Sequence, residues 1–482
     1  MQRSAALVLL STALLCVGSR AHAAAPRPAT RIDSFPSVTA IRSMLAERIR
    51  ALGGRQRGIG IVVGIIGPQG RSVIAYGLRS RRDPRPLDGN TVFETGSVGK
   101  LFTALALADM VRAGEIAFDD PVARYLPTGA VVPERNGHAI TLLDLATHTS
   151  GLPFMPNAVP VYSYHAGSLY GTEQFYRFLA GCRLTSDPGS EWNYSNLGYW
   201  LLGQALEHRA RTTFAHVLQM RIFAPLNMTS TTVVPPLPQN VDARLAVGHN
   251  AVLQPALPFY DLSIYAAMPS AGGEVSTIDD MLRFLAVALG YERSPIASSM
   301  ALMLTQRRPI EAGREQAVGW VVQRSGSGEL ITHDGATGGY NSYIAWDPQR
   351  RIGVVIFSNQ LASIDDIGLH LLRPNVPLAK PNVTLPTEIA LAPASLSAYA
   401  GTYESSGIGS FTIAGASGFL TIRLPVDWGL PVFRLRPESR TSFFVAELPL
   451  RVVFRLDGRR RVAGMLVYPP RGQRGIFAKR TR

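Results

Sequence analysis

Apolar stretches near both ends of a long first segment predict β-strands. Residues 58–66 form a β-rich apolar run, and the turn at 67–70 leads into a hairpin partner at 71–78. A second strand pair is predicted at 342–346 and 352–357. Helical and loop patterns fill the sequence between the two pairs. We therefore predict an α+β fold, in which an antiparallel sheet is closed by the two ends of the domain and flanked by helices.

The last part of the chain has a different pattern. Prolines are dense between residues 374 and 394, which predicts a linker. Short alternating runs separated by turns predict strands at 419–424, 433–436, 442–446 and 451–455. Asp457-Gly458 is typical of a two-residue hairpin turn. Residues 395–482 are therefore predicted to form a small all-β domain, a sandwich or barrel.

The first residues have the pattern of a secretory signal peptide. Arg3 supplies a positive charge, residues 5–17 are apolar, and Ala21-His22-Ala23 is a typical cleavage site. The apolar run is too short to span a membrane. We therefore predict a signal peptide at 1–23 and a catalytic domain at 24–373. The protein is expected to be exported, periplasmic or secreted, with no transmembrane segment.

Charge and cysteine content narrow the classes of function. The 482 residues include 48 Lys and Arg against 34 Asp and Glu, a formal net charge of +14. The arginines are scattered and no nucleic-acid motif is present, so no nucleic-acid partner is predicted. The charge either reflects an arginine-rich composition or favours association with anionic cell-wall components. Of the two cysteines, Cys16 lies in the signal peptide, so we predict no disulfide framework, no metal site and no cofactor.

Lysine is rare in this chain, and Lys100 is the only one before residue 380. Only 3 of the 48 basic residues are lysines, and Lys100 follows Ser97 by three positions. The stretch 101–113 is apolar nearly all round and predicts a buried helix, so the two side chains should lie on one face, a turn apart. A buried amine can lose its proton, unlike a guanidinium, and can then activate a serine nucleophile. The alternative is a surface lysine that has this spacing by chance.

A second segment offers groups that such a pair needs. Tyr194 and Asn196 form a Y-x-N tripeptide, and an extended backbone would place both side chains on the same side. A phenol whose pKa is lowered by a nearby cation can relay protons, and an amide can hold a substrate carbonyl. Alternatively, the two residues cap a turn.

A third segment, residues 331–340, predicts a strand that ends in a glycine-rich bend. Such a bend lets the backbone approach a ligand closely. A free N–H there could pair with the N–H of Ser97 to hold a developing oxyanion. His333 could donate a hydrogen bond to a substrate carboxylate or carbonyl. The alternative is a glycine hairpin that carries a surface histidine.

Taken in the order S-x-x-K, Y-x-N and H-x-G, these segments resemble the serine β-lactamase-like family, in particular the class C β-lactamases, D,D-peptidases and related esterases. The resemblance extends from about Ile59 to Asn359. It is carried by residues 93–100, 142–153, 194–196 and 333–339. The tail resembles the lipocalin-like β-barrels appended to some members, with Tyr399-Ala400-Gly401-Thr402-Tyr403 as its opening.

The resemblance implies catalytic roles for three residues. Ser97 would be the acylated nucleophile, Lys100 would take its proton, and Tyr194 would be the partner base and proton shuttle.

The resemblance also implies a substrate site. Asn196 would orient the substrate, and the N–H groups of Ser97 and Ala336 would form the oxyanion hole beside Gly335. His333 stands where class C β-lactamases carry the lysine of a K-T-G triad, and Asp334 replaces the threonine. A histidine is only partly charged near neutral pH, and Asp334 would repel a carboxylate unless strand alternation turns it away. The likeness therefore predicts the reaction type better than the substrate.

These observations together predict an exported serine hydrolase that cleaves an amide or ester bond through an acyl-serine intermediate. The substrate would be a peptidoglycan-type peptide, a small ester or a β-lactam. A family carboxylesterase is one alternative. A catalytically weak cell-wall-binding or sensor protein is another, suggested by the altered triad, the basic charge and the extra β-domain.

Overall fold

The computed structural model describes most of the chain after its first 34 residues. The described ranges are 35–54, 57–155, 171–250, 253, 255–256, 269–326, 328–380, 387–405, 409–416, 418–425, 432–445, 450–468 and 476–481. The predicted signal peptide lies outside them. No helix in these ranges is long and apolar enough to cross a membrane.

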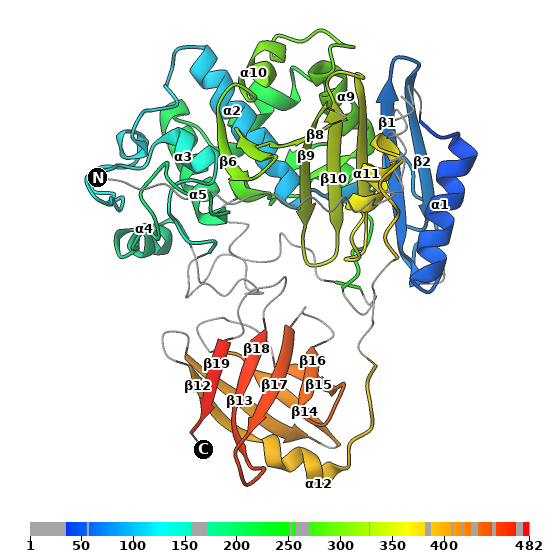
Figure 1. The fold of residues 1–482 in the computed structure, drawn as a ribbon, viewed down its shortest axis with the longest axis vertical. Helices are drawn as coiled ribbons and strands as arrows, with labels where there is room; N and C mark the ends of the chain where they lie inside the picture. Colours follow the sequence, from blue (N-terminus) through cyan, green and yellow to red (C-terminus); the bar gives the residue numbers. More distant parts are fainter. Residues whose placement is uncertain are drawn as a thin grey trace, which may run out of the picture. The chain divides into compact units, whose positions relative to one another are not determined.

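An eight-stranded antiparallel sheet forms the centre of the first domain (Figure 1). The order is β2-β1-β11-β10-β9-β8-β7-β6, so the first hairpin pairs directly with the last strand of the sheet. The predicted closure of the sheet by the two ends of the domain is confirmed. The strands are β1 (Gly60–Gly67), β2 (Gly70–Gly77), β6 (Arg307–Glu311), β7 (Arg314–Ala317), β8 (Val321–Ser325), β9 (Gly328–Ala336), β10 (Asn341–Asp347) and β11 (Ile352–Ser358).

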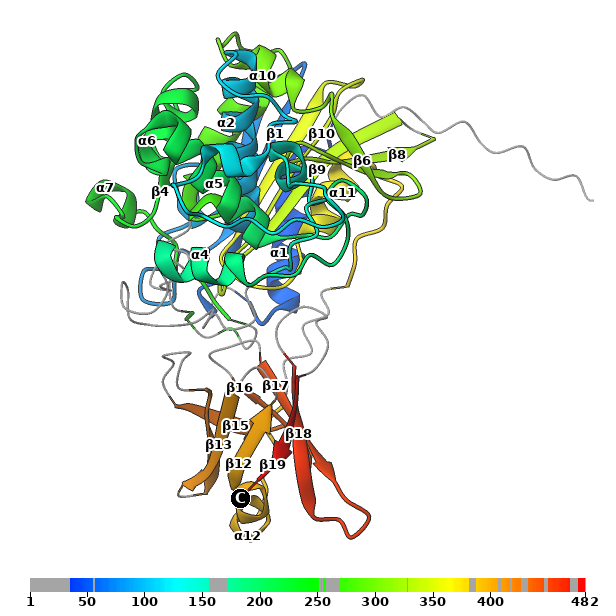
Figure 2. The same cartoon turned by 90° about the vertical axis from the view of Figure 1, so that its left-hand side faces the viewer.

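Helices cover both faces of the sheet, because alternate residues of the central strands are apolar on each side. Helices α1 and α11 share one core with Ile61 and Val63 of β1, whereas α2 and α9 share another core with Val62. Figure 2 shows α2, α5 and α6 together on one side of the sheet. The helices are α1 (Val38–Ala51), α2 (Lys100–Arg112), α3 (Leu142–Ala146), α4 (Thr172–Ala180), α5 (Asn196–Ala210), α6 (Phe214–Leu218), α7 (Gln239–Asp242), α9 (Ile278–Ala288), α10 (Ala297–Leu302), α11 (Asp365–Leu372) and α12 (Pro393–Leu396).

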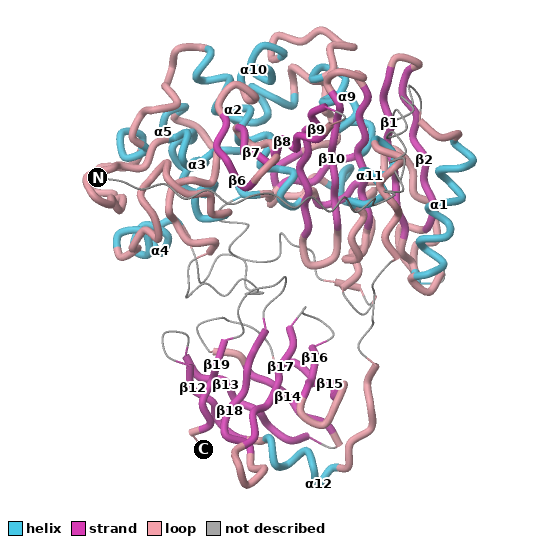
Figure 3. The backbone as a smooth tube through the Cα atoms, viewed as in Figure 1, coloured by secondary structure: helices cyan, strands magenta, loops and turns pink. Residues whose placement is uncertain are grey.

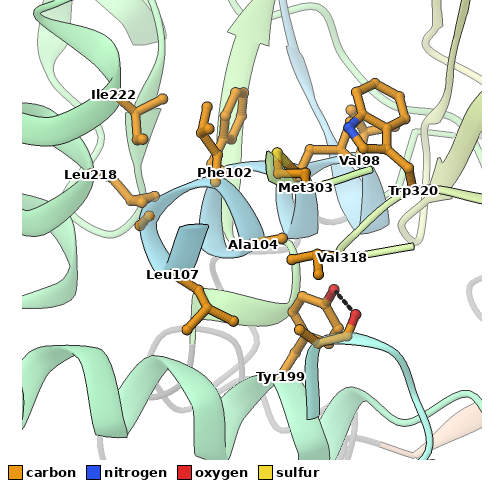
Figure 4. Close-up of a cluster of buried hydrophobic side chains, with 14 of the residues drawn as sticks. Val98, Phe102, Ala104, Leu107, Tyr199, Leu218, Ile222, Met303, Val318 and Trp320 are labelled. Atoms are coloured by element: carbon orange, nitrogen blue, oxygen red, sulfur yellow. Dashed lines mark hydrogen bonds between the residues drawn. The ribbon is translucent and has the colours of Figure 1, made fainter. Parts of the chain in front are cut away.

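Helix α2 is enclosed by apolar side chains on several sides. Figure 4 shows Leu218 and Ile222 on one side of it and Met303, Val318 and Trp320 on another. Ten of its residues are buried, as its continuous apolar sequence predicts. The helix ends at Arg112, and Gly114 follows with φ +70°, a conformation that favours glycine. The first turn of α2 is therefore held rigidly inside the domain.

A small three-stranded sheet leads the chain into α2. Its order is β3-β5-β4. Strand β3 ends two residues before the 3₁₀ turn Gly96–Gly99, which runs straight into α2. The strands are β3 (Val92–Glu94), β4 (Thr232–Val233) and β5 (Glu274–Thr277).

The C-terminal strands close into an eight-stranded antiparallel barrel in sequence order, as the sequence predicts for its all-β tail (Figure 3). Its interior is filled by aromatic and aliphatic side chains such as Tyr403, Phe411 and Phe443. The strands are β12 (Gly401–Ser405), β13 (Gly409–Ala416), β14 (Phe419–Arg423), β15 (Phe433–Pro437), β16 (Ser442–Val445), β17 (Leu450–Leu456), β18 (Val462–Tyr468) and β19 (Ile476–Arg480).

The hairpin predicted at Asp457-Gly458 is present, but the prediction of a two-residue turn was wrong. The strands β17 and β18 are joined by residues 457–461. The carboxylate of Asp457 accepts hydrogen bonds from the N–H groups of Arg459 and Arg461, and Arg460 takes the positive φ of +60°. An aspartate that bonds its own loop favours this longer turn.

Both described parts of the predicted linker are tied to neighbouring elements. The carbonyl of Ala379 accepts a hydrogen bond from Arg48 of α1, and the backbone N–H of Ala379 donates to Asp366 of α11. Glu388 pairs with Arg434 and Arg436 of β15. The two described parts of the predicted linker therefore each contact a neighbouring helix or strand. The domain boundaries at 373/374 and 394/395 stay predictions.

The ion pair between Arg48 and Asp366 joins helices α1 and α11 of the first domain, and it is nearly buried. We expect Arg48→Met to lower the free energy of unfolding by about 3 kcal/mol, because Asp366 would keep a buried charge without its partner. Arg42→Met, at an exposed site of the same helix, should change it by less than about 0.5 kcal/mol. Urea unfolding followed by tryptophan fluorescence measures both values, and equal values would contradict a structural role for this ion pair.

Candidate active site

The structure brings together three side chains that the sequence places far apart. The Oγ of Ser97 lies 3.0 Å from the Nζ of Lys100, and the hydroxyl of Tyr194 donates to the same Oγ at 2.8 Å. Ser97 is in the 3₁₀ turn, Lys100 opens α2, and Tyr194 precedes α5 by two residues. The serine hydroxyl therefore has an amine on one side and a phenol on the other.

The amine of Lys100 is fully shielded from solvent. It donates to the carbonyl of Ala271 at 2.6 Å and lies 5.1 Å from the centre of the Tyr194 ring. Burial lowers the pKa of Lys100 to about 7, while the carboxylates of Glu274 and Asp334 act in the opposite direction. A substantial fraction of this lysine is therefore a neutral amine at neutral pH, which is the form that can accept a proton.

Close backbone approaches surround Ser97. A Cβ on Gly335 would lie 2.9 Å from the backbone nitrogen of Ser97, and a Cβ on Gly96 would lie 2.8 Å from that of Ala336. Gly96 also has φ +52°. The end of β9 therefore lies directly against the turn that carries the serine. This arrangement brings the N–H groups of Ser97 and Ala336 close together, as an oxyanion hole requires.

Strand alternation separates His333 from Asp334. His333 pairs with Ile344 of β10, whose side chain is in the core shared with α2. Asp334 pairs with Tyr343, whose side chain packs in the core of α1 and α11, so the Asp334 side chain lies on the opposite face from Lys100. The carboxylate of Asp334 is thus turned away from the serine.

His333 is a neutral imidazole rather than a cation. Burial and, to a smaller extent, the positive charge of Lys100 lower the pKa of His333 to about 4, against the raising effect of Asp334. Its Nδ1 lies 2.7 Å from the carbonyl of Asp334. Because a carbonyl only accepts, Nδ1 carries the proton and Nε2 is left as an acceptor.

Asn196 is less directly connected than the other predicted residues. It opens α5, and its Nδ2 lies 3.6 Å from the sulfur of Met155. Its Oδ1 is buried without a hydrogen-bond partner in the described part of the chain. No hydrogen bond within that part joins it to Ser97 or Lys100. The role of Asn196 in orienting the substrate therefore stays a prediction.

His148 is a site residue that the sequence analysis quoted in a motif but gave no role. Its ring lies 4.2 Å from the Tyr194 ring and 5.0 Å from the Tyr199 ring, centre to centre. Its Nδ1 accepts from the N–H of Ser195 at 3.1 Å, and burial holds its pKa well below the usual value. His148 therefore supports the phenol as a neutral ring. Its positive φ of +58° is a feature that sequence patterns do not reveal.

Glu274 is a second residue that the sequence analysis missed. It begins β5, is 1% exposed, and influences the pKa of Lys100. Isolated acidic residues in a strand give no sequence signal of their own. Among the described residues, no group of three or more His, Cys, Asp or Glu side chains could hold a metal ion.

A helix-flanked antiparallel sheet that presents a serine between a buried amine and a phenol defines a serine hydrolase. The family follows from comparison with known proteins: the family model described as Beta-lactamase matches residues 45–371, so the chain belongs to the β-lactamase family.

Two relatives of the chain are named as hydrolytic enzymes. The chain is 31% identical over 402 residues to the D-alanyl-D-alanine-carboxypeptidase/endopeptidase AmpH of Escherichia coli K12, covering 77% of this chain and 98% of that protein. It is 25% identical over 377 residues to a β-lactamase of Yersinia enterocolitica, covering 69% of this chain and 92% of that protein.

A solved structure shares the fold of the first domain. The β-lactamase/D-alanine carboxypeptidase of Yersinia pestis, complexed with citrate, superposes with a TM-score of 0.56 at 24% identity. The match covers 67% of this chain and 92% of that one. The predicted fold class and the predicted enzyme class are both confirmed.

The pKa of Lys100 predicts how activity depends on pH. Because only the neutral amine accepts a proton, we expect kcat/KM to rise with pH through about 7. Lys100→Arg should lose at least about 100-fold in kcat/KM at every pH, since a guanidinium stays protonated. Ester hydrolysis measured between about pH 5 and about pH 9 tests both statements. The exposed Lys380→Arg is the matched control, and retained turnover in Lys100→Arg would contradict the assignment of the base.

Proposed function

We propose that this protein hydrolyses D-alanyl peptides of the peptidoglycan type through an acyl-serine intermediate on Ser97. The observation that carries the proposal is the Ser97 hydroxyl held by both Lys100 and Tyr194. The relative that matches 77% of the chain is named as a D-alanyl-D-alanine carboxypeptidase/endopeptidase, which favours this substrate class.

In the acylation step, the neutral amine of Lys100 takes the proton of Ser97 while Oγ attacks the substrate carbonyl carbon. The carbonyl oxygen becomes an oxyanion, and the N–H groups of Ser97 and Ala336 stabilise it. The C–N bond then breaks, and the proton passes through the Tyr194 hydroxyl to the leaving amine. The product is an ester between Ser97 and the substrate acyl group.

In the deacylation step, water attacks the ester carbonyl and Ser97 leaves as the alcohol. The water loses its proton to the same amine–phenol pair, and Ser97 regains one, so the enzyme returns to its starting state. Because Lys100 is shielded from solvent, its amine can take the neutral form that both half-reactions need.

His333 favours a substrate without a carboxylate at its position. A neutral ring whose Nε2 accepts a hydrogen bond attracts an N–H or O–H donor, whereas a cation there would attract an anion. The carboxylate of a β-lactam and the C-terminal carboxylate of a D-Ala-D-Ala peptide would both be weakly held at this position. His333 therefore does not choose between these two substrates, and the D-alanyl class rests on the named relative. A family carboxylesterase is the second candidate, because the neutral His333 suits an uncharged ester equally well.

Ser97→Ala tests the nucleophile. It should abolish covalent labelling by fluorescent penicillin or by a fluorophosphonate, since no other serine in the described site contacts both Lys100 and Tyr194. Ser298→Ala, at an exposed site of α10, should label like the wild type. Labelling that persisted in Ser97→Ala would remove Ser97 from its role.

The substrate class is tested on the wild-type protein with D-Ala-D-Ala peptides, p-nitrophenyl esters and nitrocefin. Turnover of the peptides above that of nitrocefin supports the peptidase. Turnover of esters alone would favour the carboxylesterase. Absence of any adduct by intact mass would favour the binding or sensor protein.

We also propose that the protein is exported and that its barrel associates with the cell wall. The signal-like pattern at 1–23 supports export. Residues 395–482 contain 14 Lys and Arg and five Asp and Glu, so the tail has a net charge of +9, most of the +14 of the whole chain. An arginine-rich composition spread evenly along the chain would not concentrate charge in this way. The excess favours an anionic polymer as partner.

The exposed hairpin that follows β17 offers a test of this association. Arg459→Gln with Arg460→Gln should weaken cosedimentation with anionic cell-wall polymer and reduce its salt dependence, because two exposed cations are removed. Arg81→Gln with Arg82→Gln, an adjacent exposed pair in the first domain, is the matched control. Equal loss in both double variants would assign binding to overall charge and not to the barrel.

A further inference from the structure

A buried carboxyl group lies near the Lys100 amine and has no part in the steps above. Glu274 is 1% exposed at the start of β5, the strand that follows the Lys100 contact at Ala271 by three residues. Apart from its own backbone N–H, neither carboxyl oxygen has a hydrogen-bond partner in the described part of the chain. Such a group is costly to bury without a task.

The chain makes room for this carboxyl at one residue. A Cβ on Gly99 would lie 1.9 Å from Oε2 of Glu274, far closer than any real contact. Gly99 has φ −58° and ψ −24°, helical values that any residue adopts. Glycine is therefore needed here for space and not for backbone conformation. The residue directly before Lys100 is the one that admits the carboxyl group.

Burial moves the proton affinities of the two groups toward each other. It lowers the pKa of Lys100 to about 7 and raises the pKa of Glu274 to about 8. Each charge opposes the shift of the other, since an ammonium favours a carboxylate and a carboxylate favours an ammonium. Groups that interact in this way titrate as a pair.

Among the titratable groups around Lys100, Glu274 is the one that can exchange a proton with the amine. His148 and His333 are held neutral, and Asp334 is exposed on the opposite face of the sheet. The phenols of Tyr194 and Tyr199 also face the amine. The buried Glu94 of β3 pairs with Val275, so strand alternation places its side chain on the face of the small sheet opposite to Glu274. In the described site, Glu274 is the buried acid that influences the amine.

We propose that Glu274 is a positioning residue that competes with Lys100 for one proton and so sets the pH at which the amine can accept the proton of Ser97. When the pair holds one proton, its transfer from ammonium to carboxylate yields a neutral amine and a carboxylic acid with no change in net charge. The active form is the one with the proton on Glu274. This inference rests on the proposed roles of Ser97 and Lys100.

Glu274→Gln and Glu274→Leu remove the competing carboxylate. Without it the ammonium is less favoured, so the acid limb of the acylation rate should move to lower pH by on the order of one unit. The rate of labelling by fluorescent penicillin, measured against pH, gives this limb. Glu207→Gln is the matched control: its carboxyl also has a raised pKa, is bonded to the N–H of Phe214, and does not influence Lys100.

A second readout needs no turnover. The chain has three lysines, so selective lysine labelling gives three NMR side-chain signals, and the signal lost in Lys100→Arg is that of Lys100. Its titration should move to lower pH in both Glu274 variants and stay in place in Glu207→Gln. A Lys100 titration and an acid limb that are unchanged in the Glu274 variant that folds would overturn the inference. Persistent labelling of Ser97→Ala would overturn the proposed function instead, while the lysine titration would still test the pairing.

Discussion

The exclusion of water from one amine is the constraint on which this site depends. In water, Lys100 would be an ammonium at every physiological pH and could accept nothing. Inside the domain, it donates hydrogen bonds to the carbonyl of Ala271 and to the Oγ of Ser97, and burial outweighs the nearby negative charges. The buried helix α2 therefore has a chemical consequence. It holds the amine in an environment that lowers its pKa and at hydrogen-bond distance from the hydroxyl of Ser97.

The fold supplies this environment by bringing distant segments to one point. The serine turn follows β3, the end of β9 lies against this turn, and Tyr194 lies two residues before α5. Glycines at the contacts let these backbones approach more closely than side chains would allow. Because each group comes from a different element of a packed core, the site is held by the core as a whole.

The groups around the serine are mostly neutral, which separates the catalytic step from substrate selection. His148 supports the Tyr194 ring without adding charge, and His333 offers an acceptor in place of a cation. The amine, hydroxyl and phenol that the proposed proton transfer needs are thus in contact, while a neutral imidazole stands at the predicted substrate-binding position. Differences in substrate between members of the β-lactamase family can arise at such positions without disturbing the amine–hydroxyl pair.

The sequence by itself determined the elements and the chemistry of single segments. Apolar runs predicted the two strand pairs of the sheet, alternating runs predicted the barrel, and the rarity of lysine in an arginine-rich chain indicated a candidate base at Lys100. These signals are local, because periodicity and spacing depend on neighbours in the chain. Only the tertiary structure decided that Asp334 faces away, that His148 supports the phenol, and that Glu274 lies in the space left by Gly99. Those facts depend on strand register and on packing between segments far apart in sequence, which no local pattern encodes.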